Sequence, residues 1–450
     1  MGPRLLHYSD LENAYDDPER VGRLAGLLQQ LDGDDAVLAG AGDDTSPGML
    51  PLICEGRQAL DLFEAVEPDV HTFGNHDFDY GPEATREIVR DSPQTWVSAN
   101  VHRNGDRFAA DLGTRPWEIV EAVGDRVGVF GLTDPTTESI NPNADGLRFD
   151  DPVEAAREAV PALREEGVDY VVALSHLGLG DDELVQAVDV DAILGAHVHS
   201  RRIDRLNGTV LTRPGVNATT VLEVELPSGE VTCHDVLEAP LDESVAESLR
   251  ERKRAAGLDE VVATVEEPIQ RGRTQTFAGE SRVGNLVADA YRWATGADVG
   301  LQNSGGIRGG APLEGEVTVA DLVSLVPFEE PIEVAELTGD ELLAVLREAG
   351  GGNLAFGEDE WWHAHVGGAE VVYDRDAGEI VEASVDGEPV RPDRTYTLAT
   401  PSFLFYTDHE FPSLTEDHRV ETLDLQYEVV VEYAREEGLD PEIEGRVRFA

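Results

Sequence analysis

Carboxylate, imidazole and amide side chains occur in short clusters through the first half of the chain, and each cluster follows an apolar run. The clusters are Asp10 and Glu12; Asp43 and Asp44; Asn75, His76, Asp77 and Asp79; His176; and His197 with His199. Such side chains, meeting at one edge of a sheet, suit divalent metal ions. Two ions about 3.5–4 Å apart can clamp the attacking and leaving oxygens of an in-line phosphoryl displacement. The sequence therefore favours a metal site of this kind.

The last of these clusters has informative spacing. His197 and His199 stand two residues apart directly after a predicted strand, so both side chains can point to the same side. Taken alone, the pair is more typical of one packed and one exposed histidine. Together with the other clusters, it favours two metal ligands.

The elements that must position these side chains alternate along the chain. Runs typical of buried strands occupy residues 36–39, 127–130, 170–174 and 191–194. Helical patterns occupy residues 19–31, 56–66, 152–167 and 181–188. This alternation predicts a layered α/β sheet, which binds its ligands at the carboxyl ends of its strands.

A chain of 450 residues is too long for one compact core, so we expect two domains. Residues 209–237 are rich in strand patterns, residues 241–256 form a charged helical stretch, and a second α/β block begins near residue 261. We predict a first domain over 1–238, a linker helix over 239–262 and a second domain over 263–450.

The charge is strongly acidic. Asp and Glu total 91 against 34 Lys and Arg, the net charge is −57, and Lys253 is the single lysine. The acidic residues are spread along the whole chain, which argues against an acidic tail that recruits basic partners. In molar salt the Debye length falls to about 3 Å and screens this repulsion. We therefore expect a surface adapted to high salt, and a nucleic-acid partner is excluded because phosphate backbones would be repelled.

Nothing in the sequence predicts export or membrane insertion. No apolar run approaches the roughly 20 residues that span a bilayer, and the first residues do not resemble a signal peptide. Cys54 and Cys233 lack metal-type spacing, and we expect free thiols. The expected location is cytoplasmic, with no membrane partner; the oligomeric state stays open.

Five motifs occur in the order and rough spacing of the calcineurin-like metallophosphoesterases. They are Asp-Leu-Glu at 10–12, Gly-Asp at 42–43, Gly-Asn-His-Asp at 74–77, Ser-His at 175–176 and Gly-Ala-His-Val-His at 195–199. More narrowly, residues 74–81 and the Asn-Ser-Gly-Gly-Ile-Arg stretch at 303–308 resemble the 5′-nucleotidase family, here of haloarchaeal type. The resemblance covers essentially the whole chain. It implies a four-layer α/β-β-α sandwich followed by a second α/β (α+β) substrate-binding domain.

The resemblance also implies a role for each residue of the first domain. Asp43 would bridge two divalent metal ions. His76, held by Asp79, would be catalytic, and a metal-activated hydroxide would be the nucleophile. The remaining ligands would divide into two sets, Asp10, Glu12 and His199 at one ion and Asn75, His176 and His197 at the other.

Glu12 is a departure from the family, which usually has histidine at this position. A glutamate makes the site harder and more anionic, which favours Mn²⁺, with Zn²⁺ as the other candidate. Alternatively, Glu12 is a solvated acid and one site lacks a ligand. Asp44 and Asp77 are expected to support the site and not to bind metal.

In the second half the resemblance implies a nucleotide site. Phe328 and Phe411 would stack on the base, a contact worth about 1–3 kcal/mol per base. Asn303 would contact the nucleoside, Arg308 the phosphate and Asp417 the ribose. Residues 406–410 and Phe277 depart from the family at positions that bind substrate, and the Trp361-Trp362-His363 run is unusual.

We therefore expect a metal-dependent hydrolase that releases phosphate from nucleoside monophosphates, with a nucleotide as its substrate. A 2′,3′-cyclic nucleotide phosphodiesterase, a UDP-sugar hydrolase or another phosphomonoesterase with the same metals is the alternative. A third hypothesis is a binding protein whose catalytic residues have decayed, and Glu12 is its one support among the ligands.

Overall fold

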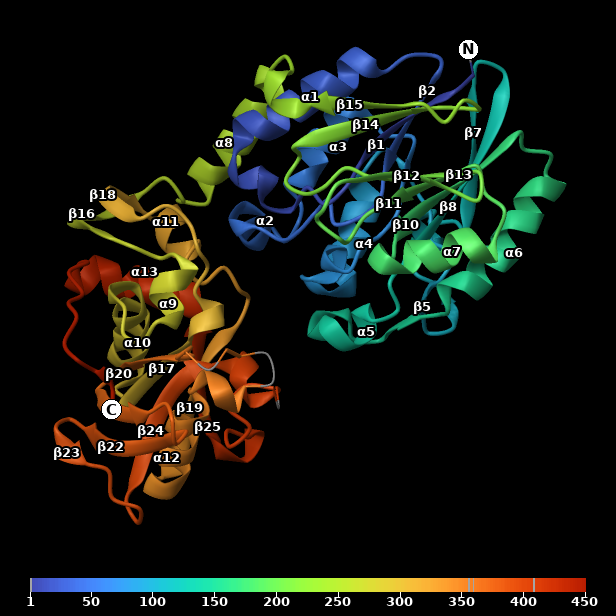
Figure 1. Cartoon of the computed structure of the whole chain (residues 1–450). Coiled ribbons are helices and arrows are strands. Elements are labelled where there is room, and N and C mark those ends of the chain that lie inside the picture. Colours follow the sequence, from blue (N-terminus) through green and yellow to red (C-terminus); the bar gives the residue numbers. More distant parts are fainter. Residues whose placement is uncertain (1, 355–356, 359, 408) are drawn as a thin grey trace. The chain divides into compact units, whose positions relative to one another are not determined.

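The computed structural model describes residues 2–354, 357–358, 360–407 and 409–450. The chain forms two compact units, Met1–Ala256 and Gly257–Ala450 (Figure 1). Each unit is described by itself.

The first unit contains two six-stranded sheets. The first sheet has the order β15 (Val231–Asp235), β14 (Thr220–Glu225), β1 (Arg4–Tyr8), β2 (Ala36–Gly40), β3 (Val70–His71) and β4 (Thr95–Trp96). The second has the order β12 (Arg202–Leu206), β13 (Thr209–Arg213), β11 (Ala192–Gly195), β10 (Tyr170–His176), β8 (Asp125–Thr133) and β7 (Trp117–Ala122). A small third sheet has the order β6 (Asp106–Arg107), β5 (Val101–Arg103) and β9 (Leu147–Phe149).

The α-helices of this unit are α1 (Pro18–Leu31), α2 (Met49–Cys54), α3 (Ala59–Val66), α4 (Gly81–Asp91), α5 (Thr137–Ile140), α6 (Pro152–Glu165), α7 (Asp181–Ala187) and α8 (Glu243–Ala255). Their starts follow from local chemistry. Asp17 and Asp151 accept backbone N–H groups at the starts of α1 and α6, and each is followed by a proline. Proline at the first helical position lacks the N–H that would be unpaired there.

Packing of the two sheets produces the layers. Leu5, Val37 and Val70 of the first sheet share one core with Val129, Val172 and Leu194 of the second. Successive side chains of a strand point to opposite faces, so each sheet also buries an outer face. Helices α6 and α7 cover that face of the second sheet, and α1 and α3 lie along the first (Figure 1). The order helix, sheet, sheet, helix is the predicted four-layer sandwich.

The second unit is also mixed α/β. Its main sheet has the order β20 (Ala364–Gly367), β17 (Val299–Asn303), β24 (Thr395–Pro401), β19 (Pro331–Thr338) and β25 (Arg419–Leu425). Smaller sheets are β23 (Glu388–Pro389), β22 (Glu379–Val385), β21 (Ala369–Asp374) and β26 (Val447–Phe449), and β16 (Val261–Ile269) with β18 (Leu313–Thr318). The helices are α9 (Arg273–Phe277), α10 (Arg282–Thr295), α11 (Val319–Val323), α12 (Gly339–Glu348) and α13 (Gln426–Glu437).

The predicted elements of the first half are all present, with shifted ends. The helix expected at 56–66 begins only at Ala59. Gly56 has a φ of +77°, outside the helical region, so the chain turns there before the helix starts. The charged stretch at 241–256 forms α8, which belongs to the first unit and packs against α1.

Candidate active site

Parallel strands that end in register bring the predicted ligands together. Tyr8 of β1 pairs with Gly40 of β2, and Gly40 with His71 of β3, so the loops with Asp10, Asp43 and Asn75 leave the sheet at one edge. In the second sheet, Ser175 of β10 pairs with Gly195 of β11, which places His176 beside the loop of His197 and His199.

Several predicted ligands have an unusual backbone conformation. Asp10, Glu12, Asp43 and His197 have φ angles of +52°, +45°, +55° and +73°. The left-handed region is uncommon for residues other than glycine, and such strain persists where the surrounding structure imposes it. Its concentration here is typical of a functional site.

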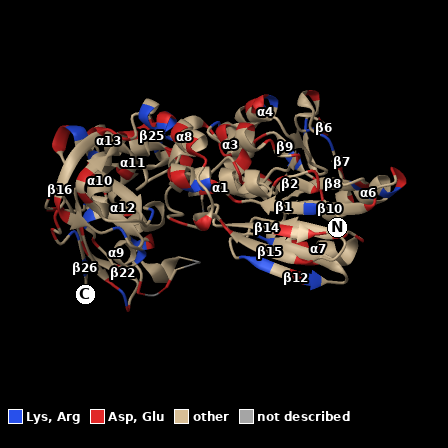
Figure 2. Ribbon diagram, turned by 90° about the horizontal axis from the view of Figure 1, so that it is seen from above, with Lys and Arg blue, Asp and Glu red and all other residues tan. Residues whose placement is uncertain are grey.

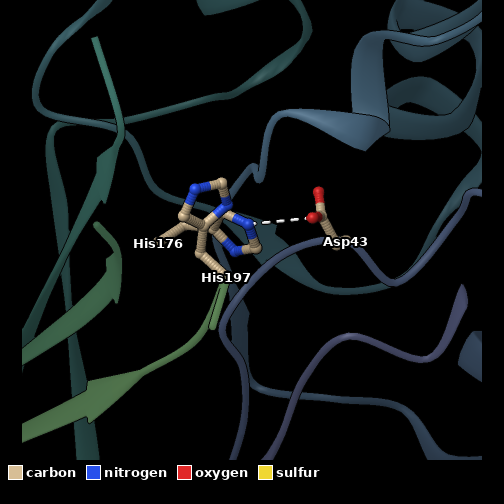
Figure 3. A group of neighbouring side chains, drawn as sticks. All are labelled: Asp43, His176 and His197. Atoms are coloured by element: carbon tan, nitrogen blue, oxygen red, sulfur yellow. Dashed lines mark ion pairs between the residues drawn. The ribbon is translucent and has the colours of Figure 1, made fainter. Parts of the chain in front are cut away.

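Two groups of ligand atoms form at this edge. In the first, Asp43, His176 and His197 offer atoms that all lie within 4.8 Å of one another (Figure 3). In the second, Asp10, Glu12 and His199 do the same.

The two groups are joined by short contacts. The backbone N–H of His197 donates to Asp10 Oδ1 at 3.0 Å, and the N–H of Glu12 to the carbonyl of Asp43 at 3.4 Å. Glu12 lies within its group, with Oε1 2.8 Å from His199 Nε2. The alternative of a solvated Glu12 does not match its 4% exposure.

Asn75 lies next to these groups. The N–H of His76, the following residue, donates to Asp43 Oδ1 at 2.7 Å. Asn75 itself is buried, and its Oδ1 accepts no hydrogen bond within the described part of the chain. A buried amide oxygen without a donor carries a free-energy penalty of about 1–3 kcal/mol, which a cation would remove.

The electrostatics of the centre also fit bound cations. Burial, reinforced by the charges of Asp43 and Asp10, raises the pKa of Glu12 to about 8. Burial raises the pKa of Asp10 as well. Burial alone would lower the pKa of His176, but the Asp43 carboxylate outweighs it and raises that pKa. Closely packed buried carboxylates are unfavourable without compensating charge, and divalent cations supply that charge.

His76 and Asp79 form a hydrogen-bonded pair beside the ligands. His76 Nδ1 lies 2.9 Å from Asp79 Oδ2, and the His76 side chain is 38% exposed. Burial opposes a charge on His76, but Asp43 and Asp79 raise its pKa to about 10. An imidazolium in this position can donate a proton or a hydrogen bond through Nε2.

Asp77 and Asp44 support the loops from inside. The Asp77 carboxylate accepts the backbone N–H groups of Asp43, Gly74 and Thr45 at 3.0, 2.7 and 3.2 Å. Asp44 Oδ2 lies 2.9 Å from His71 Nε2, and both side chains are fully buried. Sequence reasoning did not single out His71 for this role, and it missed Ser46 and Asn141, which contact Asp79. No pattern marks these residues, because their partners are distant in sequence.

In the second unit, Asn303 ends β17 and donates from Nδ2 to Glu410 Oε2 at 2.8 Å. The Arg308 guanidinium lies 4.6 Å from the centre of the Phe328 ring, a cation–π contact. Asp417 is exposed, on the short 3₁₀ helix Glu416–His418.

Phe411 has a different environment from the one that stacking on a base requires. Its ring is 0% exposed and lies against the His363 ring at 6.0 Å, with 17° between the planes. His363 Nε2 in turn lies 2.7 Å from Glu410 Oε2. In this conformation Phe411 presents no free face, so the structure does not bring it into an open pocket with Phe328.

Phe277 and Trp361 complete this cluster. The Phe277 ring centre lies 4.7 Å from that of Trp361 and 5.6 Å from that of His363. The exposed Arg273 guanidinium lies 4.7 Å from both the Phe277 and the Trp361 ring centres. The described sequence departures at 277, 361–363 and 410 therefore meet in one place.

Comparisons with known proteins identify the family. Residues 3–201 match the model of calcineurin-like phosphoesterases, and residues 261–416 match the model of the 5′-nucleotidase C-terminal domain. The chain belongs to the 5′-nucleotidase family, and the predicted fold class and family are confirmed. Calcineurin-like metallophosphoesterases use a two-metal site, and the residues described above can hold such a pair.

Individual relatives agree with this assignment. The chain is 25% identical to a trifunctional nucleotide phosphoesterase protein of Bacillus subtilis, over 99% of this chain but only 34% of that relative's length. It is 23% identical to a 5′-nucleotidase of Diplobatis ommata, over 92% of this chain and 81% of that relative. The crystal structure of a 5′-nucleotidase precursor from Thermus thermophilus shares the fold, with a TM-score of 0.72, 24% identity and 99% coverage of both chains. Within the described residues, no helix combines the length and the apolar character needed to cross a membrane.

Proposed function

We propose that this protein hydrolyses the phosphate ester of nucleoside 5′-monophosphates at a pair of divalent cations in the first unit. The observation that carries this proposal is the meeting of the two ligand groups, Asp43 with His176 and His197, and Asp10 with Glu12 and His199. The similarity to a 5′-nucleotidase over most of both chains supports the choice of substrate.

The proposed ligand sets follow the two groups. Asp43 lies between the groups and would contribute to both cations; Asp10, Glu12 and His199 would hold one, and Asn75, His176 and His197 the other. The bound pair supplies a water of lowered pKa as the nucleophile and positive charge for the phosphoryl oxygens. The set combines three carboxylates and one amide oxygen with three imidazoles, and its oxygen donors favour Mn²⁺, with Zn²⁺ as the other candidate.

His76 acts on the leaving group in this proposal. Its Nδ1 is held by Asp79, so Nε2 is free to donate a proton to the ester oxygen as it departs. Asp79 fixes the orientation of the His76 ring, and its carboxylate stabilises the positive charge of the protonated imidazole.

The second unit is proposed to bind the nucleoside through Asn303, Arg308, Phe328, Phe411 and Asp417. Phe328 and Arg308 are already in contact, whereas Phe411 would have to leave its buried position against His363. The family often has an arginine that grips phosphate where this chain has Phe277. Arg273 is the candidate to replace that contact, since it is exposed and held only by two aromatic rings among the described contacts. Arg282 is not, because its guanidinium donates to backbone carbonyls, including that of Pro441 at 2.7 Å.

One observation favours a second candidate substrate. Glu410 Oε2 accepts the side-chain N–H of Asn303, and the His363 ring stacks on Phe411. Two residues expected to contact the nucleoside therefore already have partners within the second unit. A 2′,3′-cyclic nucleotide or a UDP-sugar remains the alternative to a nucleoside monophosphate.

A substrate panel tests the proposal. AMP, UDP-glucose, 2′,3′-cyclic AMP and glycerophosphate are assayed with Mn²⁺ or Zn²⁺ in high-salt buffer, with phosphate release as the readout. We expect kcat/KM to be highest for AMP. We also expect phosphate release to stop when a chelator removes the divalent cations. The proposal is wrong if AMP is the poorest substrate, or if elemental analysis finds no divalent ion bound and none restores hydrolysis.

The setting of the protein is part of the proposal. The spread of acidic residues over both units (Figure 2) supports a highly saline cytoplasm of haloarchaeal type. Residues 1–238 and 263–450 are proposed as the functional domains; residues 239–262 between them include α8, which packs on the first unit.

A further inference from the structure

A segment that contains none of the predicted motifs contacts Asp79 of the proposed His76–Asp79 catalytic pair. It lies between β8 (Asp125–Thr133) and β9 (Leu147–Phe149), and it carries Asn141 directly after α5 (Thr137–Ile140). Asn141 is 7% exposed. A buried asparagine has two N–H donors and one acceptor oxygen to satisfy, so its partners define its role.

Each hydrogen-bonding group of the Asn141 side chain has a partner. Its Nδ2 donates to Asp79 Oδ1 at 3.0 Å and to the carbonyl oxygen of Asn75 at 2.9 Å. Its Oδ1 accepts the backbone N–H of Asn143 at 3.0 Å, which fixes the orientation of the amide. One amide therefore joins the loop of a proposed metal ligand to the acid of the catalytic pair.

The Asp79 carboxylate is held from three directions as a result. Its Oδ2 receives the Ser46 hydroxyl at 2.8 Å and lies 2.9 Å from His76 Nδ1, while its Oδ1 receives Asn141. Hydrogen bonds to a carboxylate are stronger than those between neutral groups, and three of them fix the carboxylate plane. A fixed plane sets the direction in which the His76 ring points.

We propose that Asn141 is a positioning residue that holds the His76–Asp79 pair at a fixed place relative to the Asn75 loop. This inference rests on the proposed function, in which His76 protonates the leaving oxygen. Asn141 touches neither the substrate nor the cations; it acts through Asp79. Its loss should slow the reactions that depend on leaving-group protonation and spare those that do not.

Leaving-group dependence separates this role from a general structural one. A nucleoside alkoxide leaves only with a proton, whereas p-nitrophenolate leaves well without one. In Asn141→Asp, a carboxylate of the same shape faces Asp79 Oδ1 and repels it. Because positioned proton donation contributes about 10²–10⁴-fold, we expect kcat for AMP to fall about 10–100-fold and kcat for p-nitrophenyl phosphate to fall less than about threefold.

Two further variants sharpen the test. In His76→Ala, the additional change Asn141→Asp should have no further effect on AMP, because residues that act through one group are not additive. Glu138→Gln is the matched control, since Glu138 is an exposed residue of α5, the helix that directly precedes Asn141. Its kcat for both substrates should stay within about twofold of the parent, as surface changes do.

Bound cations and thermal melting are measured on every variant, and we expect two cations and a melting temperature close to the parent's in Asn141→Asp. Equal losses on both substrates, a lost cation, or an additive effect in the double variant would overturn the inference while leaving the proposed function in place. If the parent protein hydrolyses neither substrate with either cation, the proposed function fails, and the inference fails with it.

Discussion

At the scale of single residues, departures from the family pattern compensate one another. Phe277, His363 and Glu410 each differ from what the resemblance leads one to expect, and each looks damaging alone. In the structure they form one packed and hydrogen-bonded group, with Glu410 Oε2 2.7 Å from His363 Nε2. Because the three side chains contact one another, we expect the effects of changing them to be non-additive.

Glu330 is a residue whose charge state should be visible in stability. Burial raises its pKa to about 7, against the opposing charge of Arg308. Its pKa is therefore higher in the folded than in the unfolded chain, so the native state holds an extra proton between pH 4.5 and 7. Stability falls as pH rises through this window, and at pH 8 the loss amounts to at most about 3 kcal/mol.

Glu330→Gln should remove this dependence. We expect the variant to melt several degrees above the parent at pH 8 and at the same temperature at pH 5, by roughly 2–4 °C per kcal/mol. Differential scanning calorimetry at constant salt measures both. Glu336→Gln, an exposed glutamate of the same unit, is the control, and a variant that tracks the parent at both pH values would contradict the assignment.

At the scale of elements, the site depends on how closely two strand ends approach. The loop after β3 passes the loop after β2 at Gly74, where a Cβ would lie 2.6 Å from the Asp43 nitrogen and overlap its side-chain oxygen. The same two loops are tied by the Asp77 carboxylate. Glycine is required at 74 for space.

Gly74→Ala should therefore displace Asp43 and weaken cation binding more than it weakens the fold. We expect Mn²⁺ affinity, measured by calorimetric titration, to fall at least tenfold, with a stability change of about 1–3 kcal/mol typical of overpacking. Gly33→Ala is the control, because a Cβ there meets its nearest neighbour at 3.4 Å. Unchanged affinity in Gly74→Ala would show that the two loops can separate without effect on the cations.

At the scale of the whole molecule, the net negative charge determines how the stability of the fold depends on salt. A net charge of −57 with acidic residues spread over both units (Figure 2) generates self-repulsion that salt relieves. The Debye length falls from about 10 Å at 0.1 M salt to about 3 Å at 1 M.

We therefore expect the melting temperature to rise steadily as KCl increases from about 0.1 M to about 2 M, and to rise most at the low end, where screening changes fastest. The same titration in sorbitol at matched osmolality separates screening from a general effect of solutes. A melting temperature that is independent of KCl would contradict adaptation to high salt.

The fold class and the ligand types could be predicted from the sequence because both depend on local patterns. Apolar runs alternate with helical periodicity, and each candidate ligand cluster follows a strand. Parallel strands that pair in register therefore bring Asp10 and Asp43 to one edge of the first sheet, and His176 lies at the end of a strand of the second sheet. The order of the elements thus predicts a shared edge within each sheet, whereas the packing of one sheet on the other brings His176 Nε2 to 2.9 Å from Asp43 Oδ2.

The tertiary structure alone decided which side chains form hydrogen bonds with the candidate site residues. Asn141 lies more than 60 positions from Asp79, and Glu410 more than 100 from Asn303, so neither contact leaves a periodic signal. The burial of Phe411 against His363 also leaves no signal in the sequence, because the burial of a ring depends on which distant residues pack against it. Local periodicity specifies strands and helices, whereas contacts between distant loops are set by the packing of the completed fold.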